Sequence, residues 1–224
     1  MVAIHSIINR IKMKKIFFFI ALAAFMATMS VSCTDYDLID TGTANGKHEC
    51  SMWDYFGSDQ YNWDSLRVMA TYAGLDDIYK GTSQYGTGLT VFGITNHSIR
   101  RYLLSNGYNA VKDMPVEDCK RIILSTIMEG NSKLMLDDFI SGTASSNPNT
   151  VIGTGGKMYK MLSGEELWIY TFREPYGGVQ QAGPKKIYIV SQESQRTTEV
   201  ASCNIETQTG VVHALSYNFN LNDF

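Results

Sequence analysis

Apolar residues in the first half of the chain recur three and four positions apart, which is the spacing of one face of an α-helix. In the clearest case, Asp64 or Ser65 can cap a helix that ends at Gly74, because glycine favours the left-handed conformation found after a last helical turn. The same reasoning predicts further helical segments over 75–79, from Thr95 or Asn96 to Leu104, and from Pro115 to Met128.

β-forming runs dominate the second half. An early strand is expected at 89–92, and later strands are expected at 157–162, 167–172, 185–190, 199–205 and 211–215. Between the two halves, the polar, glycine-rich stretch 141–156 is interpreted as a flexible connecting loop. Helices that come first and strands that come later predict an α+β domain rather than alternating βαβ units.

The amino end has a different pattern. Four basic residues over 10–15 precede an apolar run over 16–29, which is followed by small residues and Cys33. At about 1.5 Å per residue, this run is too short to cross a bilayer core of about 30 Å as a helix. We therefore interpret 1–32 as a lipoprotein signal peptide and Cys33 as the site of lipid attachment. Met13, which two lysines follow, suits the start of such a signal as well as Met1 does.

A signal of this kind predicts an exported protein. A lipid on Cys33 would anchor the chain to a bacterial outer membrane, in a periplasmic or surface-facing position. Residues 33–47 are then an acidic flexible tether, and residues 48–224 form a single domain. Lipoprotein signals usually carry an aliphatic residue where this chain has Ser30. A soluble-secretion signal cut near Ser32 therefore stays open as an alternative.

The charge balance argues against nucleic-acid binding. Four of the 19 Lys and Arg residues and none of the 22 Asp and Glu residues precede Cys33. The chain from Cys33 onward therefore carries 19 − 4 = 15 basic and 22 acidic residues, a net charge of −7. Binding to phosphate backbones needs clustered Lys and Arg, and the sequence contains no basic stripe.

The remaining cysteines are Cys50, Cys119 and Cys203. They form no CxxC pair, which argues against a zinc ribbon or a thioredoxin-type site. Cys119 falls on the apolar face of its predicted helix, where a thiol acts as a small hydrophobic group. A Cys50–Cys203 disulfide and a set of free thiols both remain possible. The acidic pairs at 76–77 and 137–138 lack the spacing of a calcium loop, so neither a metal nor another cofactor is expected.

Four sequence blocks follow one another in the order of a known family. They are 63–75, which ends in Ala-Gly-Leu, 88–96 (GLTVFGITN), 161–167 (MLSGEEL) and 204–215 (NIETQTGVVHAL). On these blocks the chain resembles a fasciclin-like domain. The resemblance implies an α+β fold, a β-sandwich or wedge with helices packed on one side, and an adhesive or binding role without catalysis. The signature residues are Thr90, Val91, Phe92, Thr95, Asn96, Asn204, Ile205, Gly210 and His213.

The chain departs from the family pattern at three places. Gly93-Ile94 replaces the usual Ala-Pro, residues 125–128 lack the expected Tyr-His pair, and Asn204 replaces an Asp. The Tyr-His and Asp-Ile motifs are associated with integrin binding in animal members of the family. Integrin recognition is therefore not expected here.

Several signature residues suit structural roles. Thr95 or Asn96 can accept hydrogen bonds from the first amides of the following helix. Gly210 would permit the positive φ of a tight hairpin. His213 lies in an apolar strand and is expected to be a hydrogen-bonded structural residue rather than a catalyst.

The aromatic residues Trp53, Tyr55, Tyr61 and Trp63 suit either a carbohydrate-stacking platform or the floor of the core. Three functions are considered. The first is an adhesion or binding module that holds a surface glycan or an envelope protein. The second is a glycan-capture accessory lipoprotein of a polysaccharide-uptake system, which requires exposed tryptophans. The third is an enzyme that uses His97, which requires a carboxylate within about 3 Å of its ring.

Overall fold

The architecture comes from a computed structural model, which describes residues 46–224. The predicted signal peptide, Cys33 and nearly all of the predicted tether lie outside the described residues. Between residues 46 and 224, no helix combines the length and the apolar character that a membrane span requires.

Helices fill the first half of the described chain, as the periodicity predicts. They are α2 (Met52–Ser58), α3 (Gln60–Ala73), α4 (Asp76–Lys80), α5 (Asn96–Ser105) and α6 (Val116–Leu124), with short 3₁₀ turns η1 (Val111–Asp113) and η2 (Leu136–Asp138). The strands are β1 (Leu89–Gly93), β2 (Gly142–Thr143), β3 (Thr154–Gly155), β4 (Lys157–Lys160), β5 (Glu166–Arg173), β6 (Lys185–Ser191), β7 (Arg196–Glu206) and β8 (Gly210–Leu215). The predicted α+β class is confirmed.

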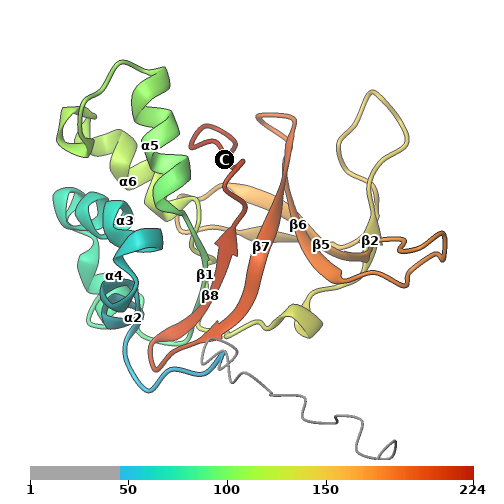
Figure 1. Ribbon diagram of the computed structural model, residues 1–224, viewed down its shortest axis with the longest axis horizontal. Coiled ribbons are helices and arrows are strands. Elements are labelled where there is room, and N and C mark those ends of the chain that lie inside the picture. Colours follow the sequence, from blue (N-terminus) through green and yellow to red (C-terminus); the bar gives the residue numbers. More distant parts are fainter. Residues whose placement is uncertain (1–45) are drawn as a thin grey trace, which may run out of the picture. The chain divides into compact units, whose positions relative to one another are not determined.

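Six of these strands form one curled sheet in the order β1-β8-β7-β6-β5-β4. Within it β1 and β8 run parallel, and the other neighbours are antiparallel. The segment 126–129 draws the two edges together, because Val91 of β1 forms a bridge with Ile127 and Met128 forms one with Met161, just beyond β4. The helices lie together on one side, next to β1 and β8 (Figure 1).

Strand β5 shows how the sheet separates two apolar clusters. Leu167 and Ile169 belong to the main core, which lies between the sheet and the helices. Trp168 and Tyr170 alternate with them and pack on the opposite face, where their rings stack with centroids 4.5 Å apart. Because side chains alternate along a strand, the inward set continues to Thr171 and then to Arg173 at the strand end.

Helix boundaries differ from the predictions where tertiary contacts decide them. Helix α3 begins earlier than Asp64, because the Asp59 side chain accepts a hydrogen bond from the Asn62 amide and caps the helix. Helix α2, which the sequence did not predict, has a similar cap from Ser51. The predicted helix end at Gly74 is confirmed, with φ of 68°.

The helix that was predicted to reach Met128 ends instead at Leu124. The residues that follow pair with β1 and β4, and sheet hydrogen bonds replace the helical ones. The stretch 141–156, predicted as a flexible loop, contains the short antiparallel ribbon β2–β3. In this ribbon the hydroxyls of Thr143 and Thr154 lie 2.7 Å apart.

Two predicted roles of signature residues are wrong. Neither Thr95 nor Asn96 caps helix α5 with its side chain. Instead Asn96 accepts a hydrogen bond from the Ser65 amide at 2.7 Å, and it donates to two carbonyls at the start of α3. Gly210 does not have a positive φ. A Cβ at that position would lie 2.3 Å from the carbonyl oxygen of Leu89, so the close approach of β1 to β8 explains the glycine.

Candidate functional site

Three signature residues hold one segment of backbone, residues 132–136. The Thr90 hydroxyl donates to the carbonyl of Ser132 and accepts from the amide of Leu134, at 2.6 and 2.9 Å. Asn204, which has a left-handed φ of 64°, accepts from the amide of Leu136 at 2.7 Å. These bonds fix a segment that is otherwise a loop.

His213 completes this set of contacts from strand β8. Its ring is fully buried between Phe92 and Phe139, and its Nε2 lies 2.8 Å from the carbonyl oxygen of Leu134. The amide of Asn204 points to Nδ1 at 3.4 Å, which fits a neutral ring that donates from Nε2. Burial lowers the pKa of His213 to about 4, although the bond to Leu134 opposes the shift. His213 is thus a hydrogen-bonded residue of the core.

The other signature residues form part of the core or its margin. Val91 and Phe92 are fully buried in β1, and Ile205 is buried in β7. The Thr95 hydroxyl is buried without a hydrogen-bond partner in the described part of the chain.

The aromatic residues near the amino end are mostly part of the core. Trp63 is 2% exposed, so it cannot stack on a sugar, and the ligand-binding prediction is wrong for this residue. Trp53 and Tyr55 are half-buried against the same core, and the guanidinium of Arg67 lies 4.5 Å from the Trp53 ring centroid. Because Trp63 is buried, Trp53 and Trp63 cannot form a solvent-facing pair, which opposes the glycan-capture hypothesis in the form that depended on such a pair.

The buried position of Trp63 also explains a departure from the family pattern. A Cβ at Gly93 would lie 2.6 Å from the ring of Trp63 and 3.0 Å from Val212. The alanine that the family usually has at this place would therefore collide with the indole ring. Glycine is required at 93 as long as Trp63 fills this space.

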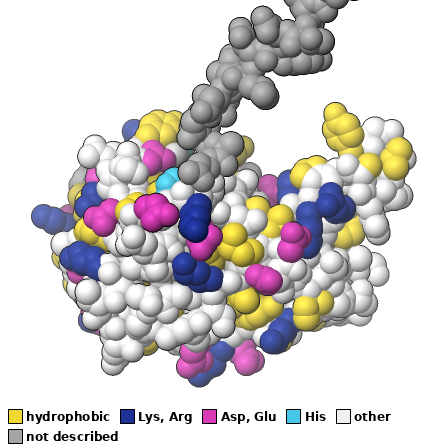
Figure 2. Space-filling model, turned by 90° about the horizontal axis from the view of Figure 1, so that it is seen from below, with side chains coloured by type: hydrophobic (Ala, Val, Ile, Leu, Met, Phe, Trp, Pro, Cys, Tyr) yellow, Lys and Arg dark blue, Asp and Glu magenta, His cyan; other side chains and the backbone are white. Residues whose placement is uncertain are grey.

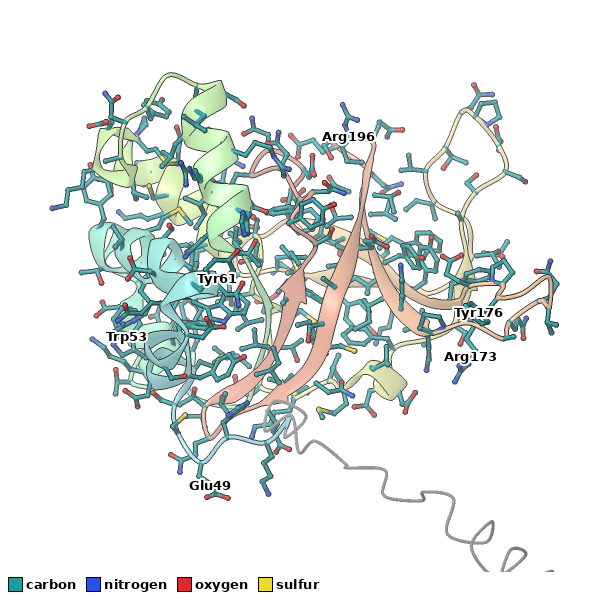
Figure 3. The ribbon with its side chains drawn as sticks, viewed as in Figure 1. Glu49, Trp53, Tyr61, Arg173, Tyr176 and Arg196 are labelled. Atoms are coloured by element: carbon teal, nitrogen blue, oxygen red, sulfur yellow. The ribbon has the colours of Figure 1, made fainter. Side chains whose placement is uncertain are left out.

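Tyr61 is the exposed member of the aromatic group, at 74% exposure. It lies at the start of α3 (Figure 3) and packs edge-on against His97, with ring centroids 5.7 Å apart. Among residues 46–224, no Asp or Glu lies within ion-pair distance of His97. The hypothesis of an enzyme that uses His97 therefore lacks the carboxylate that it requires.

Cys50, Cys119 and Cys203 are free thiols in this structure. Of the two alternatives, the Cys50–Cys203 disulfide is therefore not formed. Cys119 is fully buried in α6, as its position on the apolar face predicts. Burial raises its pKa to about 11, which keeps the thiol protonated and unreactive at neutral pH.

A groove of about 550 Å³ opens where the inner face of the sheet becomes polar. It lies between the β2–β3 ribbon and the ends of β5 and β6, at the mouth of the curled sheet. Hydroxyl groups, glycine backbone and charged side chains supply most of its surface. Its lining residues include Ser141, Thr143, Thr154, Thr171, Arg173, Gln181 and Lys185, together with Asp137 from η2.

Two cations and one carboxylate face this groove. Lys185 pairs with Asp137 at 2.8 Å, and the Lys185 side chain is only 19% exposed whereas that of Asp137 is 87% exposed. The hydrogen bond to Lys185 lowers the pKa of Asp137, and Arg173 lowers it further. Figure 2 shows basic and acidic side chains next to each other on the right-hand side of the face in view, with hydrophobic side chains beside them.

The signature residues are connected to this groove through the segment that they hold. Asn204 bonds to the amide of Leu136, which is the residue before Asp137. Lys133, in the same segment, donates to the carbonyl of Thr207 at 2.7 Å. The position of the groove carboxylate therefore depends on contacts made deep in the sheet.

Sequence reasoning missed the groove residues. Arg173 and Lys185 are register partners in β5 and β6. Arg173 ends the inward-facing set of β5, and Lys185 begins that of β6, which continues with the buried Ile187 and Ile189. That alternation was a usable signal, because a charged residue at an inward position marks the end of an apolar face. The sequence contains no comparable indication for Asp137. This residue lies in the turn η2, and tertiary contacts rather than a local pattern bring it to the groove.

Comparisons with known proteins add little to this geometry. No family model matches the chain, and no curated protein matches it. One solved structure that resembles it is a FAS1 domain pair from the insect cell adhesion molecule fasciclin I, with a TM-score of 0.41 and 16% sequence identity. The alignment covers 68% of this chain, which spans 44% of that one. The α+β class rests on the elements described above, and a match at this level gives no information about ligands.

Proposed function

We propose that this protein is an exported, lipid-anchored, fasciclin-like binding module that holds a surface glycan without catalysis. The observation that carries the proposal is the polar groove at the mouth of the curled sheet. Ligand sites are common at the mouths of β-barrels, and the volume falls within the usual range of about 300–1,000 Å³. Hydroxyls, backbone groups and charged side chains are what a polyhydroxylated ligand needs for hydrogen bonding.

The fasciclin-like part of the proposal is supported by where the sequence blocks lie. The block 88–96 contains β1 and the block 204–215 contains β8, and these two strands pair in parallel. The block 161–167 forms the turn between β4 and β5. The non-catalytic part is supported by the positions of His213, which is buried, and His97, which has no carboxylate partner among the described residues.

Filling the groove should weaken glycan binding. Replacing Ser141, an exposed lining residue, with tryptophan (S141W) places an indole in the space that the sugar would occupy. We expect glycan affinity to fall at least about tenfold, which corresponds to a loss of about 1.4 kcal/mol. The measurement is a glycan array on the purified protein, followed by calorimetric titration of the best ligand.

A matched control is available in the same loop. Ser146 is exposed but does not line the groove, so Ser146→Trp should bind like the wild type. Unchanged glycan binding by S141W would place the ligand elsewhere. If the array stays silent and a pull-down recovers an envelope protein instead, the glycan is the wrong class of ligand.

The lipid anchor is tested at Cys33. Acylation of this thiol is the proposed source of membrane attachment, so Cys33→Ala should move the protein from the membrane fraction to the soluble fraction. Cys50→Ala is the control and should stay with the membrane. Fractionation with immunoblotting gives the answer. Equal membrane partitioning of wild type and C33A would remove the anchor from the proposal.

A further inference from the structure

The geometry points to a carboxylated saccharide, of the uronic-acid type, as the ligand of the groove, with Arg173 as the main contact for its carboxylate. This inference rests on the proposed function, since it names the chemistry of the glycan that the groove would hold. It is carried by the arrangement of Arg173, Lys185 and Asp137.

Arg173 is the groove cation that makes no direct ion pair among the described residues, although it lies near enough to Asp137 to lower the pKa of that carboxyl. Among residues 46–224 it forms no ion pair, and it donates one side-chain hydrogen bond, from Nη1 to the carbonyl of Gly183 at 3.1 Å. That bond fixes the guanidinium at the rim of the groove and leaves its other donors for a ligand. Guanidinium and carboxylate match in planar, two-point hydrogen bonding, which makes carboxylate the preferred partner.

The groove has the opposite charge from the rest of the protein. Its lining contains two cations and one carboxylate, whereas the chain from Cys33 onward has a net charge of −7. A locally positive groove on an acidic surface attracts an anionic ligand, and the surrounding surface repels that same ligand elsewhere. A neutral glycan would gain no binding energy from the positive charge of the groove.

The uncharged part of the lining favours a saccharide as the carrier of the carboxylate. Ser141, Thr143 and Thr154 present hydroxyls, and the glycines of the β2–β3 ribbon present backbone groups to the same space. The hairpin that carries Arg173 also carries Tyr176, which is 73% exposed (Figure 3). Tyr176 does not line the groove itself, so its ring would stack on the CH face of a sugar unit that extends beyond the lining residues.

Asp137 sets the selectivity of the groove. In the free protein Asp137 forms a direct ion pair with Lys185 and a weaker interaction with Arg173. An incoming carboxylate therefore meets Arg173 largely unpaired and Lys185 already neutralised. Removing the Asp137 charge should release Lys185 for the ligand. Asp137→Asn is therefore expected to tighten the binding of an acidic saccharide several-fold.

The test is calorimetric titration of the purified protein with two matched ligands. One is an oligogalacturonate, and the other is the same oligomer with its carboxylates reduced to alcohols. We expect the acidic oligomer to bind at least tenfold more tightly than the reduced one, with affinity that weakens as salt rises, because salt screens the charge pair. Arg173→Gln should remove this preference. Arg196→Gln, at an exposed arginine far from the groove (Figure 3), should retain it.

The outcomes separate this inference from the proposed function. Equal binding of the two oligomers, with no effect of R173Q, would overturn the acidic ligand and leave the groove as a neutral-glycan site. Binding of neither oligomer, together with a silent glycan array, would overturn both proposals. Equal losses of acidic-ligand affinity in R173Q and R196Q would assign the preference to general surface charge and so contradict the inference. Tenfold loss in R173Q alone, with tighter binding by D137N, supports it.

Discussion

Lowering the pH from 6.5 to 4 is expected to reduce the free energy of unfolding by about 3 kcal/mol through His213 alone. Burial lowers the pKa of this residue to about 4, from 6.5 for an ordinary histidine. The unfolded chain therefore takes up a proton before the folded chain does. The contribution of His213 is fully present above pH 6.5 and is lost as the pH falls towards 4.

Urea unfolding at pH 7 and at pH 4, followed by circular dichroism, measures this loss. His213→Gln is the informative variant, because glutamine can still donate to the Leu134 carbonyl and accept from the Asn204 amide but does not titrate. It should be less stable than the wild type at pH 7 and lose much less stability between the two pH values. His97→Gln, at an exposed histidine, should keep the wild-type pH dependence. The same pH-dependent loss in H213Q as in the wild type would contradict the assignment.

The sequence was sufficient where local spacing determines structure. Helical periodicity with a terminal glycine located α3 and α4, and β-forming runs located β4 to β8 within a few residues. It was insufficient where distant segments decide the conformation. Residues 125–128 continue a helical pattern, yet they become the connection between the edges of the sheet, because both edges lack partners there. No local sequence pattern indicates that a distant strand edge requires a pairing partner.

In the candidate site, too, the sequence predicted some of the residues and missed others. The resemblance singles out Thr90, Asn204 and His213, and all three form hydrogen bonds with one backbone segment, residues 132–136. Their contribution is to position that segment. The side chains that would touch a ligand, Arg173 and Lys185, belong to strand ends outside the resembling blocks. The signature residues fix the backbone beside the groove, and the side chains that line the groove come from other parts of the chain.

Replacing Gly210 with alanine is expected to destabilise the protein by about 3 kcal/mol. A Cβ there would lie 2.3 Å from the carbonyl oxygen of Leu89 and 3.0 Å from the Sδ-bound methyl group of Met52. Leu89 and Gly210 are register partners in the parallel β1–β8 pair, so relief of the clash requires the backbones to separate. Separation would weaken the hydrogen bond from the Gly88 amide to the Thr209 carbonyl.

Gly57→Ala is the matched control for this substitution. Gly57 lies in α2, and its added Cβ would meet the flexible end of the Arg67 side chain at 3.0 Å rather than fixed backbone. Alanine also favours the helix over glycine by up to about 1 kcal/mol, so the variant should stay within about 1 kcal/mol of the wild type. Urea unfolding at pH 7 compares the two. If G210A lowers the free energy of unfolding no more than G57A does, the close approach of β1 to β8 does not explain the glycine at 210. A positive φ would not explain it either, because Gly210 does not have one.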